Sequence, residues 1–393
     1  MINIDQIEIK DYDFELNEKH IAQEAIEPRD HSKLLVLKNN KITDEHFYHL
    51  HHYIPNGSTL VINDAKVIPA RLFFKNQNGA NIEVFLLQPY NSEYTQALQS
   101  NNECTWKCLI GNKKKWKSNE KLTIEQIQLT AELMDMEGQI VKFSWENKCS
   151  FIQLLEQIGN MPLPPYIKKR NKETDKNRYQ TVYSKTEGSV AAPTAGLHFT
   201  DHVFQELANK NTSICRVTLH VSAGTFLPVT SAKAVDHPMH SEFFSFTKSS
   251  IELLLNSQQI ICVGTTSVRV TESLYYLATN LLNNVDNPYE IGQFCGYTNY
   301  KNTFENSKTA LQFLLDYMNK NQLEEITGNT SIMIMPGYQF QFLNGLITNF
   351  HQPKSTLLLL ISAFIGERWR EVYQHAIEQQ YRFYSYGDSS LLF

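Results

Sequence analysis

Four short stretches of the chain combine small residues and hydroxyl side chains with a histidine or an arginine. They are residues 189–199, 220–226, 264–269 and 348–356. Small side chains let a ligand approach the main chain, and Gly196 in the first stretch allows backbone conformations that other residues avoid. Thr194 offers a hydroxyl group there, and His198 offers an ionisable imidazole. One such stretch is equally typical of a tight structural loop, so the ligand-site interpretation depends on the repetition.

The third stretch predicts a specific local structure. Residues 260–263 are apolar and predict a strand, and the loop 264–267, Gly-Thr-Thr-Ser, follows directly. Apolar residues then recur at helical spacing from Val268 onward. A strand, a small-residue loop and a helix N-terminus together form a site for an anion or a ribose, because free N–H groups and the helix dipole point at the ligand. The spacing is not that of a dinucleotide-binding motif or a P-loop.

The composition is that of an ordinary globular protein. A chain of 393 residues is long enough for two or three domains. Its net charge of −5 argues against wholesale wrapping by nucleic acid but allows a local basic face. No apolar signal region begins the chain, and the longest apolar run, residues 356–365, is too short to span a bilayer. The six cysteines form no C-x-x-C pair, so we expect free thiols in a reducing cytoplasm, with no membrane partner.

The N-terminal part predicts a strand, a turn and a helix. Residues 34–37 are apolar, and residues 39–40, Asn-Asn, can turn the chain. Thr43 is a candidate N-cap for a helix whose apolar face holds Phe47, Leu50 and Ile54. Histidines lie on or beside this helix without acidic or cysteine ligands at regular spacing, so we expect a solvated face rather than a metal site.

From about residue 59 the pattern changes to short strands separated by Asn, Gly, Lys and Ser. The apolar or alternating runs are residues 60–62, 67–68, 82–87, 104–110, 122–127 and 140–145. Several strands at this spacing favour a small barrel or sandwich, and we predict an inserted all-β barrel domain at residues 62–148. The charged segment 63–71 predicts an extended connection between domains. Its charges either pair with one another or face a substrate.

The remainder of the chain alternates helices and strands. Residues 151–158 predict a helix that ends at Gly159, and Ser249 with Glu252 predicts a capping box for another. Further helices are expected at 308–318 and from Ser355 or Thr356 to 365, with strands at 217–221, 260–263, 332–335 and 346–347. This alternation favours an α/β layer architecture. We therefore predict an α/β fold, in which residues 1–61 and 149–393 form a mixed-sheet α/β domain around the inserted barrel.

Two basic clusters are candidate nucleic-acid contacts. The denser one contains Lys168, Lys169, Arg170, Lys172, Lys176 and Arg178, just before the first small-residue stretch. The other is residues 113–117, which predict a hairpin tip on the β domain with Trp116 available to stack on a base. A charge run is usually only a solvated loop, and that interpretation stays open for both clusters.

Short motifs are distributed over almost the whole chain, at residues 63–72, 162–167, 179–183, 190–199, 218–229, 237–242, 263–269, 336–338, 348–356 and 381–388. Together they resemble the S-adenosylmethionine:tRNA ribosyltransferase-isomerase family of the queuosine pathway. Each motif is short, but their number and order make the resemblance specific. The chain departs from the family's usual residues at Ala65, Ser222, Ser389 and Ser390, and residues 280–330, including Gly-Asn-Thr at 328–330, look different. These departures are either neutral packing changes or the mark of a paralogue with another substrate.

The resemblance implies a cytoplasmic enzyme that uses S-adenosylmethionine as a ribosyl donor. It would transfer and isomerise the ribosyl moiety onto 7-aminomethyl-7-deazaguanine at the tRNA wobble position, giving epoxyqueuosine-tRNA, adenine and methionine. The partner implied is the tRNA anticodon loop, and the implied fold is an α/β domain with an inserted β-barrel. The reaction needs no metal or redox cofactor, and we expect a monomer.

This reaction needs a base, because a proton leaves the carbon beside the sulfonium. A histidine or carboxylate with a near-neutral pKa fits that role, and the candidates are His198, His220, His240 and Glu242. We expect about half of the histidines to be only structural, since buried imidazoles are usually hydrogen-bonded. Adenine leaves more easily when it is protonated or hydrogen-bonded, and His351 or Asn349 could serve there.

We expect S-adenosylmethionine to bind where the small-residue loops meet, because each loop ends a strand-like run or begins a helix. Its candidate contacts are Pro193, Thr194, Ala195, Gly196, Gly224, Thr225, Phe226, Gly264, Thr265, Thr266, Ser267, Arg269, Asn349 and His351. The candidate RNA contacts are Lys168, Lys169, Arg170, Lys172, Arg178, Lys114 and Lys115.

Two alternative functions are consistent with parts of the sequence. A metal-dependent hydrolase could use His198, His237, His240 and Glu242, which are ligands of the right kind, although no regular three-ligand spacing is evident. A non-catalytic RNA-binding relative is the other alternative, and the intact loop 264–267 argues against it.

Overall fold

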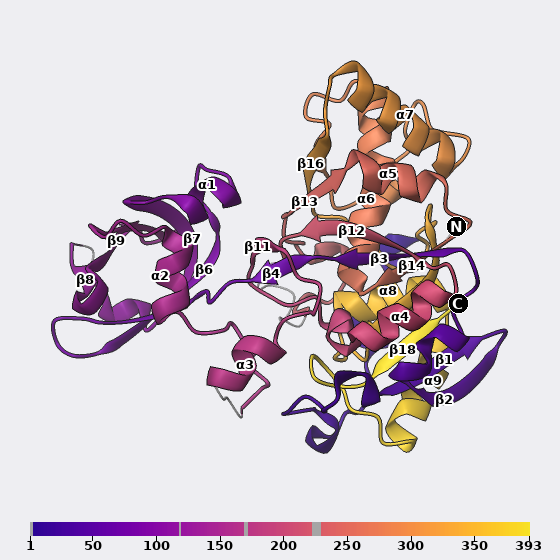
Figure 1. Cartoon of the computed structure of the whole chain (residues 1–393), viewed down its shortest axis with the longest axis horizontal. Coiled ribbons are helices and arrows are strands. Elements are labelled where there is room, and N and C mark those ends of the chain that lie inside the picture. The colour runs from indigo at the N-terminus through magenta and orange to yellow at the C-terminus, as the bar shows by residue number, and fades with distance from the viewer. Residues whose placement is uncertain (1–2, 118, 169–171, 222–228) are drawn as a thin grey trace.

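Two separate β-sheets organise the chain (Figure 1). The computed structural model describes residues 3–117, 119–168, 172–221 and 229–393. Within these ranges the large sheet has ten strands of mixed direction and the second sheet has six antiparallel strands. The predicted fold class, α/β with a small β-barrel, is thereby confirmed. The domain limits at 62 and 148 stay a prediction.

The large sheet places the ends of its central strands at one edge. Strands β12, β3, β14 and β17 are parallel neighbours in that order, and they are mostly buried on both faces. Parallel strands end at the same edge, so the loops after β14 and β17 lie side by side. The strands are β1 (Lys33–Lys38), β2 (Lys41–His46), β3 (Ser58–Asn63), β12 (Ser213–Leu219), β13 (Glu242–Thr247), β14 (Gln259–Val263), β15 (Glu290–Ile291), β16 (Glu325–Thr330), β17 (Leu343–Asn349) and β18 (Ser389–Leu392).

Helix α6 (Thr265–Leu282) is the most deeply buried helix of the part that the structure describes, and it begins directly after β14. Its residue Glu272 holds it beside β17. The carboxylate of Glu272 accepts hydrogen bonds from the backbone N–H groups of residues 341–343 and from the hydroxyl of Tyr338. Helices α5 (Lys248–Leu255), α7 (Ser307–Lys320), α8 (Thr356–Ile365) and α9 (Arg368–Glu378) share the hydrophobic core of α6, whereas α4 (Asp201–Asn209) packs in a separate core on the other face of the sheet. None of the described helices has the length and apolar content that crossing a membrane requires.

The second sheet, called the barrel below, curls so that its two edge strands, β5 and β8, approach each other. Its strands are β5 (Arg71–Lys75), β6 (Asn81–Pro89), β7 (Glu103–Gly111), β8 (Lys121–Ile124), β9 (Leu129–Asp135) and β10 (Ile140–Ser144). Helices α1 (Tyr94–Gln99) and α2 (Phe151–Ile158) accompany it, and Trp106, Phe143 and Phe151 fill its core. Figure 1 shows the barrel standing apart from the large sheet, at the left of the view.

The connection between the two sheets includes a small parallel pair, β4 (Ala65–Val67) with β11 (Thr186–Ser189). Beside it the ring of His220 stacks between Tyr94 of α1 and Phe243 of β13, with ring centroids 4.2 Å and 5.6 Å away. His220, a predicted catalytic residue, therefore lies where helix α1, which accompanies the barrel, contacts the large sheet. Helix α3 (Lys172–Arg178) lies near the same connection (Figure 1).

Two predicted helix starts are wrong. Thr43 does not cap a helix but lies in β2, opposite Val36 of β1. Asn39 and Asn40 both take positive φ, 51° and 61°, which is the two-residue turn that folds one strand back on another. Only a short 3-10 helix, Phe47–His52, follows. The cap of α5 is Thr247, which accepts from the N–H of Ser250, rather than Ser249 with Glu252.

Two strand predictions also need correction. Residues 60–62 belong to β3 at the centre of the large sheet and not to the run of barrel strands. Residues 332–335 are buried but form no strand in the described structure. An apolar run of four residues indicates that the segment is buried. Burial alone does not distinguish a strand from an extended segment that pairs with no other strand.

The stack around His220 generates a testable prediction. Burial lowers the pKa of His220 to about 4, whereas an unfolded histidine titrates near 6.5. Its contribution to stability is therefore complete above about pH 6.5 and is lost as the pH falls toward 4. Because His220→Phe keeps a ring and removes the titration, we expect the slope of the unfolding free energy against pH to decrease by up to about 1.4 kcal/mol per pH unit in this range. Urea denaturation at a series of pH values measures it. The exposed His202→Phe is the control, and an equal change in both variants would contradict the assignment.

Candidate active site

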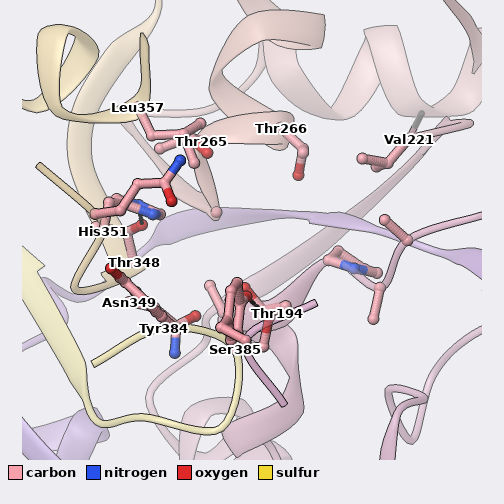
Figure 2. A pocket seen from close by; sticks show the side chains of 17 residues that line it. Thr194, Val221, Thr265, Thr266, Thr348, Asn349, His351, Leu357, Tyr384 and Ser385 are labelled. Carbon is pink, nitrogen blue, oxygen red and sulfur yellow. Dashed lines mark hydrogen bonds between the residues drawn. The ribbon is translucent and has the colours of Figure 1, made fainter. Parts of the chain in front are cut away.

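A cavity opens where β14 and β17 end and α6 begins. Including its open mouth it measures about 650 Å³. All four stretches singled out in the sequence contribute to it, within the part that the structure describes (Figure 2). Their lining residues are Ala191, Ala192, Pro193, Thr194, Ala195, Val221, Gly264, Thr265, Thr266, Thr348, Asn349, His351 and Gln352. This edge of the sheet is where open α/β folds place their ligands.

Gly264 fixes the floor of the cavity. Its N–H donates to the carbonyl of Ile347 at 2.7 Å, which joins the end of β14 to the end of β17. Its φ of 89° is one that residues with a side chain avoid, and a Cβ there would lie 3.3 Å from the Thr266 Oγ1 atom. The glycine therefore lets α6 start at the cavity, with Thr265 and Thr266 in its first turn.

His198 lies behind the wall of the cavity, and both of its ring nitrogens are used. Its Nε2 atom is 3.1 Å from the Asn349 amide nitrogen, which can only donate. Nε2 therefore accepts, and Nδ1 carries the proton and donates to the Ser32 Oγ atom at 2.7 Å. Burial lowers the pKa of His198 to about 4, so this imidazole is neutral at pH 7. The result is a fixed chain of hydrogen bonds, Ser32–His198–Asn349, called the relay below.

Two buried polar atoms on the cavity lining have no partner among the described residues. They are the Asn349 Oδ1 atom, on a residue that is 1% exposed, and the Thr266 Oγ1 atom, on a residue that is 8% exposed. Asn349 ends β17 and Thr266 lies in α6, and Figure 2 draws them on opposite sides of the cavity. An unpaired buried polar group costs about 1–3 kcal/mol, so a ligand that pairs with both would gain that energy.

Sequence analysis missed one wall of the cavity. The rings of Tyr166 and Tyr384 lie 4.6 Å apart, and the Tyr166 hydroxyl is 2.6 Å from the Ser385 Oγ atom. All three residues line the cavity, as does Leu357 of α8. Tyr166, Tyr384 and Ser385 lie in motifs 162–167 and 381–388, so the resemblance pointed to their segments. No pattern in either segment indicated that they meet.

His351 is an imidazole on the lining itself. Its Nε2 atom is 2.9 Å from the Thr348 hydroxyl, and its backbone N–H donates to the Tyr373 hydroxyl at 3.1 Å. Burial lowers the pKa of His351 to about 3, so its ring is also neutral at pH 7. A neutral imidazole has one nitrogen free of a proton and can accept one.

Several candidate site residues do not line the cavity. Gly196 packs against Tyr183 and leaves no space for a side chain, and the Ser267 hydroxyl donates to the carbonyl of Val263 at the end of β14. Arg269 pairs with Glu242 at 2.5 Å and donates to the Ile332 carbonyl, so these two predicted residues form a buried ion pair. His240 is exposed before β13. Gly224, Thr225 and Phe226 lie outside the described residues.

The alternative metal site is not assembled by the described residues. Among them no group of three or more His, Cys, Asp or Glu side chains gathers in a way that could hold a metal ion. Glu242 pairs with Arg269, and His198 is committed to the relay. The geometry therefore gives the hydrolase alternative no support.

The candidate RNA contacts have different surroundings. Arg178 pairs with Glu27 at 2.8 Å and donates to the Ile26 carbonyl, which ties it to the N-terminal segment. Lys168 is exposed, with Glu18 at 3.6 Å. Lys114 and Lys115 are exposed on a short 3-10 helix. The predicted stacking role of Trp116 is wrong, because its ring is buried and its Nε1 donates to the Glu120 carbonyl. Lys169, Arg170 and the side chain of Lys172 lie outside the described structure.

Comparison with known proteins identifies the family. The family model for queuosine biosynthesis proteins matches residues 9–392. The chain belongs to this family. A relative from Desulforamulus reducens, named S-adenosylmethionine:tRNA ribosyltransferase-isomerase, is 39% identical, over 98% of this chain and 100% of its own length. Relatives with the same name from Magnetococcus marinus and Staphylococcus epidermidis are 35% and 37% identical, over 99% and 98% of this chain and 95% and 99% of their own.

A solved structure also matches this chain. It is S-adenosylmethionine tRNA ribosyltransferase from Thermotoga maritima, which is 27% identical. The match covers 97% of this chain and 99% of that one, with a TM-score of 0.47. The family resemblance stated from the motifs is confirmed by the sequence relatives. The roles of the individual site residues stay predictions.

Substituting Gly264 tests the cavity as a binding site. Gly264→Val places a branched side chain at a positive φ and against Thr266, so we expect S-adenosylmethionine to bind at least about tenfold more weakly, or 1.4 kcal/mol. Isothermal titration calorimetry on folded protein measures the affinity.

A matched control is Gly366→Val, because Gly366 also has a positive φ, 61°, with open space around it. It introduces similar backbone strain at the end of α8, away from the cavity lining, and should leave the affinity unchanged. Equal affinity of both folded variants and wild type would argue against this site.

Proposed function

We propose that this chain is an S-adenosylmethionine:tRNA ribosyltransferase-isomerase that acts on 7-aminomethyl-7-deazaguanine at the tRNA wobble position. The products are epoxyqueuosine-tRNA, adenine and methionine. The observation that carries the proposal is the meeting of four separate sequence stretches of this family at one cavity with unpaired polar atoms. The protein works in the cytoplasm as a monomer, and the reaction needs no metal.

S-adenosylmethionine is proposed to fill the cavity with its adenine at Asn349. The Oδ1 atom of Asn349 accepts from the exocyclic amine of adenine, and Thr266 contacts the ribose at the start of α6. A sulfonium is a cation, and cations are attracted to aromatic faces. We place it near Tyr166 and Tyr384, because these rings form the remaining wall.

The relay supports a choice between His198 and His351 for proton transfer. Both nitrogens of His198 are committed, so we propose that His198 positions Asn349 and does not itself act as the base. His351 reaches the cavity and is neutral, so we propose it for proton transfer. Burial holds its pKa below the near-neutral value expected of this base, so the proposal depends on the sulfonium to acidify the reacting carbon.

The departures at residues 280–330, Ser389 and Ser390 do not conflict with this substrate, whereas Ser222 lies outside the described residues. Of the described residues between 267 and 347, none lines the cavity, so the unusual segment 280–330 lies away from it. The hydroxyls of Ser389 and Ser390 donate to the Thr348 carbonyl at 3.4 Å and 3.1 Å. They therefore support the strand that carries Asn349.

The tRNA is proposed to present its anticodon loop. Bases of a single-stranded loop can be splayed into a pocket and read there by stacking and hydrogen bonds. In a protein of net charge −5, local lysines and arginines must contact the phosphates. Lys168 to Lys172 and Lys114 with Lys115 stay candidates for these contacts.

The proposed function is tested by product analysis. The protein is incubated with S-adenosylmethionine and tRNA that carries 7-aminomethyl-7-deazaguanine, and the digested nucleosides are identified by mass spectrometry. We expect epoxyqueuosine together with equal amounts of adenine and methionine. A protein that binds tRNA, makes no new nucleoside and shows no calorimetric binding of S-adenosylmethionine would instead be the RNA-binding relative. Metal analysis of the active protein tests the metal-free reaction.

Two histidine variants separate positioning from proton transfer. His351→Ala should lower kcat about a hundredfold with little change in the affinity for S-adenosylmethionine. His198→Ala should mainly weaken that affinity, about tenfold, because Asn349 loses its support. His198→Gln should restore it, since its amide oxygen can accept from Asn349.

The pH dependence of kcat provides the control. Because the pKa of His198 is about 4, His198→Gln should leave the profile between pH 5 and 9 unchanged. A loss of kcat in both His198 variants with unchanged affinity would contradict the positioning role and favour His198 as the base.

A further inference from the structure

The outer surface of the barrel carries large apolar side chains that face solvent. Phe73 of β5 is 48% exposed and Leu109 of β7 is 43% exposed. Side chains alternate between the two faces of a strand, and the neighbours Leu72, Phe74 and Cys108 are fully buried in the barrel core. Phe73 and Leu109 therefore lie on the outer face, opposite the core.

Strand register brings these residues together. Arg71 of β5 lies opposite Phe85 of β6, and Phe85 lies opposite Leu109 of β7. Phe73 is two residues from Arg71 on the same side of β5, and so lies diagonally across from Phe85. The Arg71 guanidinium lies 4.7 Å from the centre of the Phe85 ring and covers it. We call the surface formed by Arg71, Phe73, Lys75, Phe85, Lys107 and Leu109 the barrel face.

The charges of the barrel face that make no ion pair with a described residue are positive. Lys75 and Lys107 are exposed, and neither makes an ion pair with a described residue. Glu83 of β6 lies opposite Phe73 on the same face, but its carboxylate pairs with Arg71 at 2.7 Å. The exposed Lys75 lies two residues from the exposed ring of Phe73, on the same side of β5. This combination is the one with which β-barrels bind single-stranded nucleic acid, since bases stack on rings and phosphates attract cations.

The barrel face borders a second cavity, and the linker that lines this cavity continues to the candidate active site. This cavity, of about 800 Å³ with its open mouth, has Arg71 and Phe73 on its lining together with residues 159–161 and Leu163 of the linker after α2. Tyr166, three residues further along this linker, lines the first cavity. Glu156 and Asp175 also line the second cavity, so phosphates are expected at Lys75 and Lys107, which do not line it.

We propose that the barrel face binds single-stranded nucleotides of the tRNA that flank the modified base. One base stacks on Phe73 and packs against Leu109, and the neighbouring phosphates contact Lys75 and Lys107. The identity of the RNA rests on the proposed function. The surface itself rests on exposure, register and charge, independently of the cavity that holds S-adenosylmethionine.

Matched variants test the apolar part of the face. Phe73→Ala should weaken binding of substrate tRNA about 5- to 150-fold, because a stacked base contributes about 1–3 kcal/mol. Met134→Ala is the control, since Met134 is 58% exposed on β9 of the same barrel. Filter binding measures tRNA affinity, and calorimetry should show unchanged affinity for S-adenosylmethionine in both variants.

Lysine variants test the charged part. Lys75→Ala and Lys107→Ala should each lower the slope of log Kd against log salt by about one. Lys121→Ala is the control, because Lys121 is exposed on β8 but pairs with Glu132 at 3.0 Å. We expect no change in the slope for this variant.

The outcomes distinguish this inference from the proposed function. If wild-type protein modifies tRNA and Phe73→Ala binds tRNA as tightly as Met134→Ala, the barrel face is overturned and the function stands. If wild-type protein sediments as a dimer that Phe73→Ala dissociates, with tRNA affinity unchanged, the face belongs to a second copy and the inference is wrong. A wild-type protein that modifies no tRNA would overturn the proposed function, and with it the identity of the RNA on this face.

Discussion

The orientation of the Asn349 amide depends on a buried chain of hydrogen bonds. Ser32 precedes β1, His198 lies near the end of the first small-residue stretch, and Asn349 ends β17, so the relay joins three distant parts of the sequence. The amide nitrogen of Asn349 is held by His198 and by the carbonyl of Asp388 at 3.4 Å. Its oxygen is consequently turned away from these partners, and it is left unpaired on the cavity lining. A neutral His198 is essential to this arrangement, because a protonated ring could not accept from the amide.

The rest of the large sheet holds this chain of hydrogen bonds in place. Glu272 ties α6 to the residues that begin β17, and Gly264 ties the end of β14 to the end of the same strand. Contacts at both ends of β17 therefore fix the position of the first turn of α6 relative to the amide of Asn349. A binding site between two such elements is preorganised, which lowers the entropy lost when a ligand binds.

Sequence patterns predicted the elements of the fold where a local signal was present. The helix 151–158 and the start of α6 after Gly264 follow from periodicity and small residues, and both are found. The turn at Asn39 and Asn40 was recognised, but its consequence for Thr43 was not, because the pairing of β2 with β1 is a contact between strands and not a local preference. The burial of Trp116 depends likewise on a partner elsewhere, the Glu120 carbonyl.

The sequence indicated which segments form the site, but it did not indicate which of their residues contact one another. Thr194, Thr266, Asn349 and His351 were candidates and line the cavity, because small and hydroxyl-bearing residues marked their loops. The use of both His198 nitrogens could not be read from the sequence, since Ser32 and Asn349 lie 166 and 151 residues away from it. Tyr166 and Tyr384 were missed for the same reason. Exposure of Phe73 on the barrel face is also not evident from the sequence, because Leu72, Phe73 and Phe74 are consecutive apolar residues and show no alternation.

A crystal structure with S-adenosylhomocysteine, the unreactive sulfide analogue of the substrate, tests the central claim most directly. The account predicts that the adenine amine lies about 3 Å from the Asn349 Oδ1 atom, with the Ser32–His198–Asn349 chain unchanged. Adenine bound elsewhere on the protein, or an Asn349 amide that turns and releases His198, would contradict it.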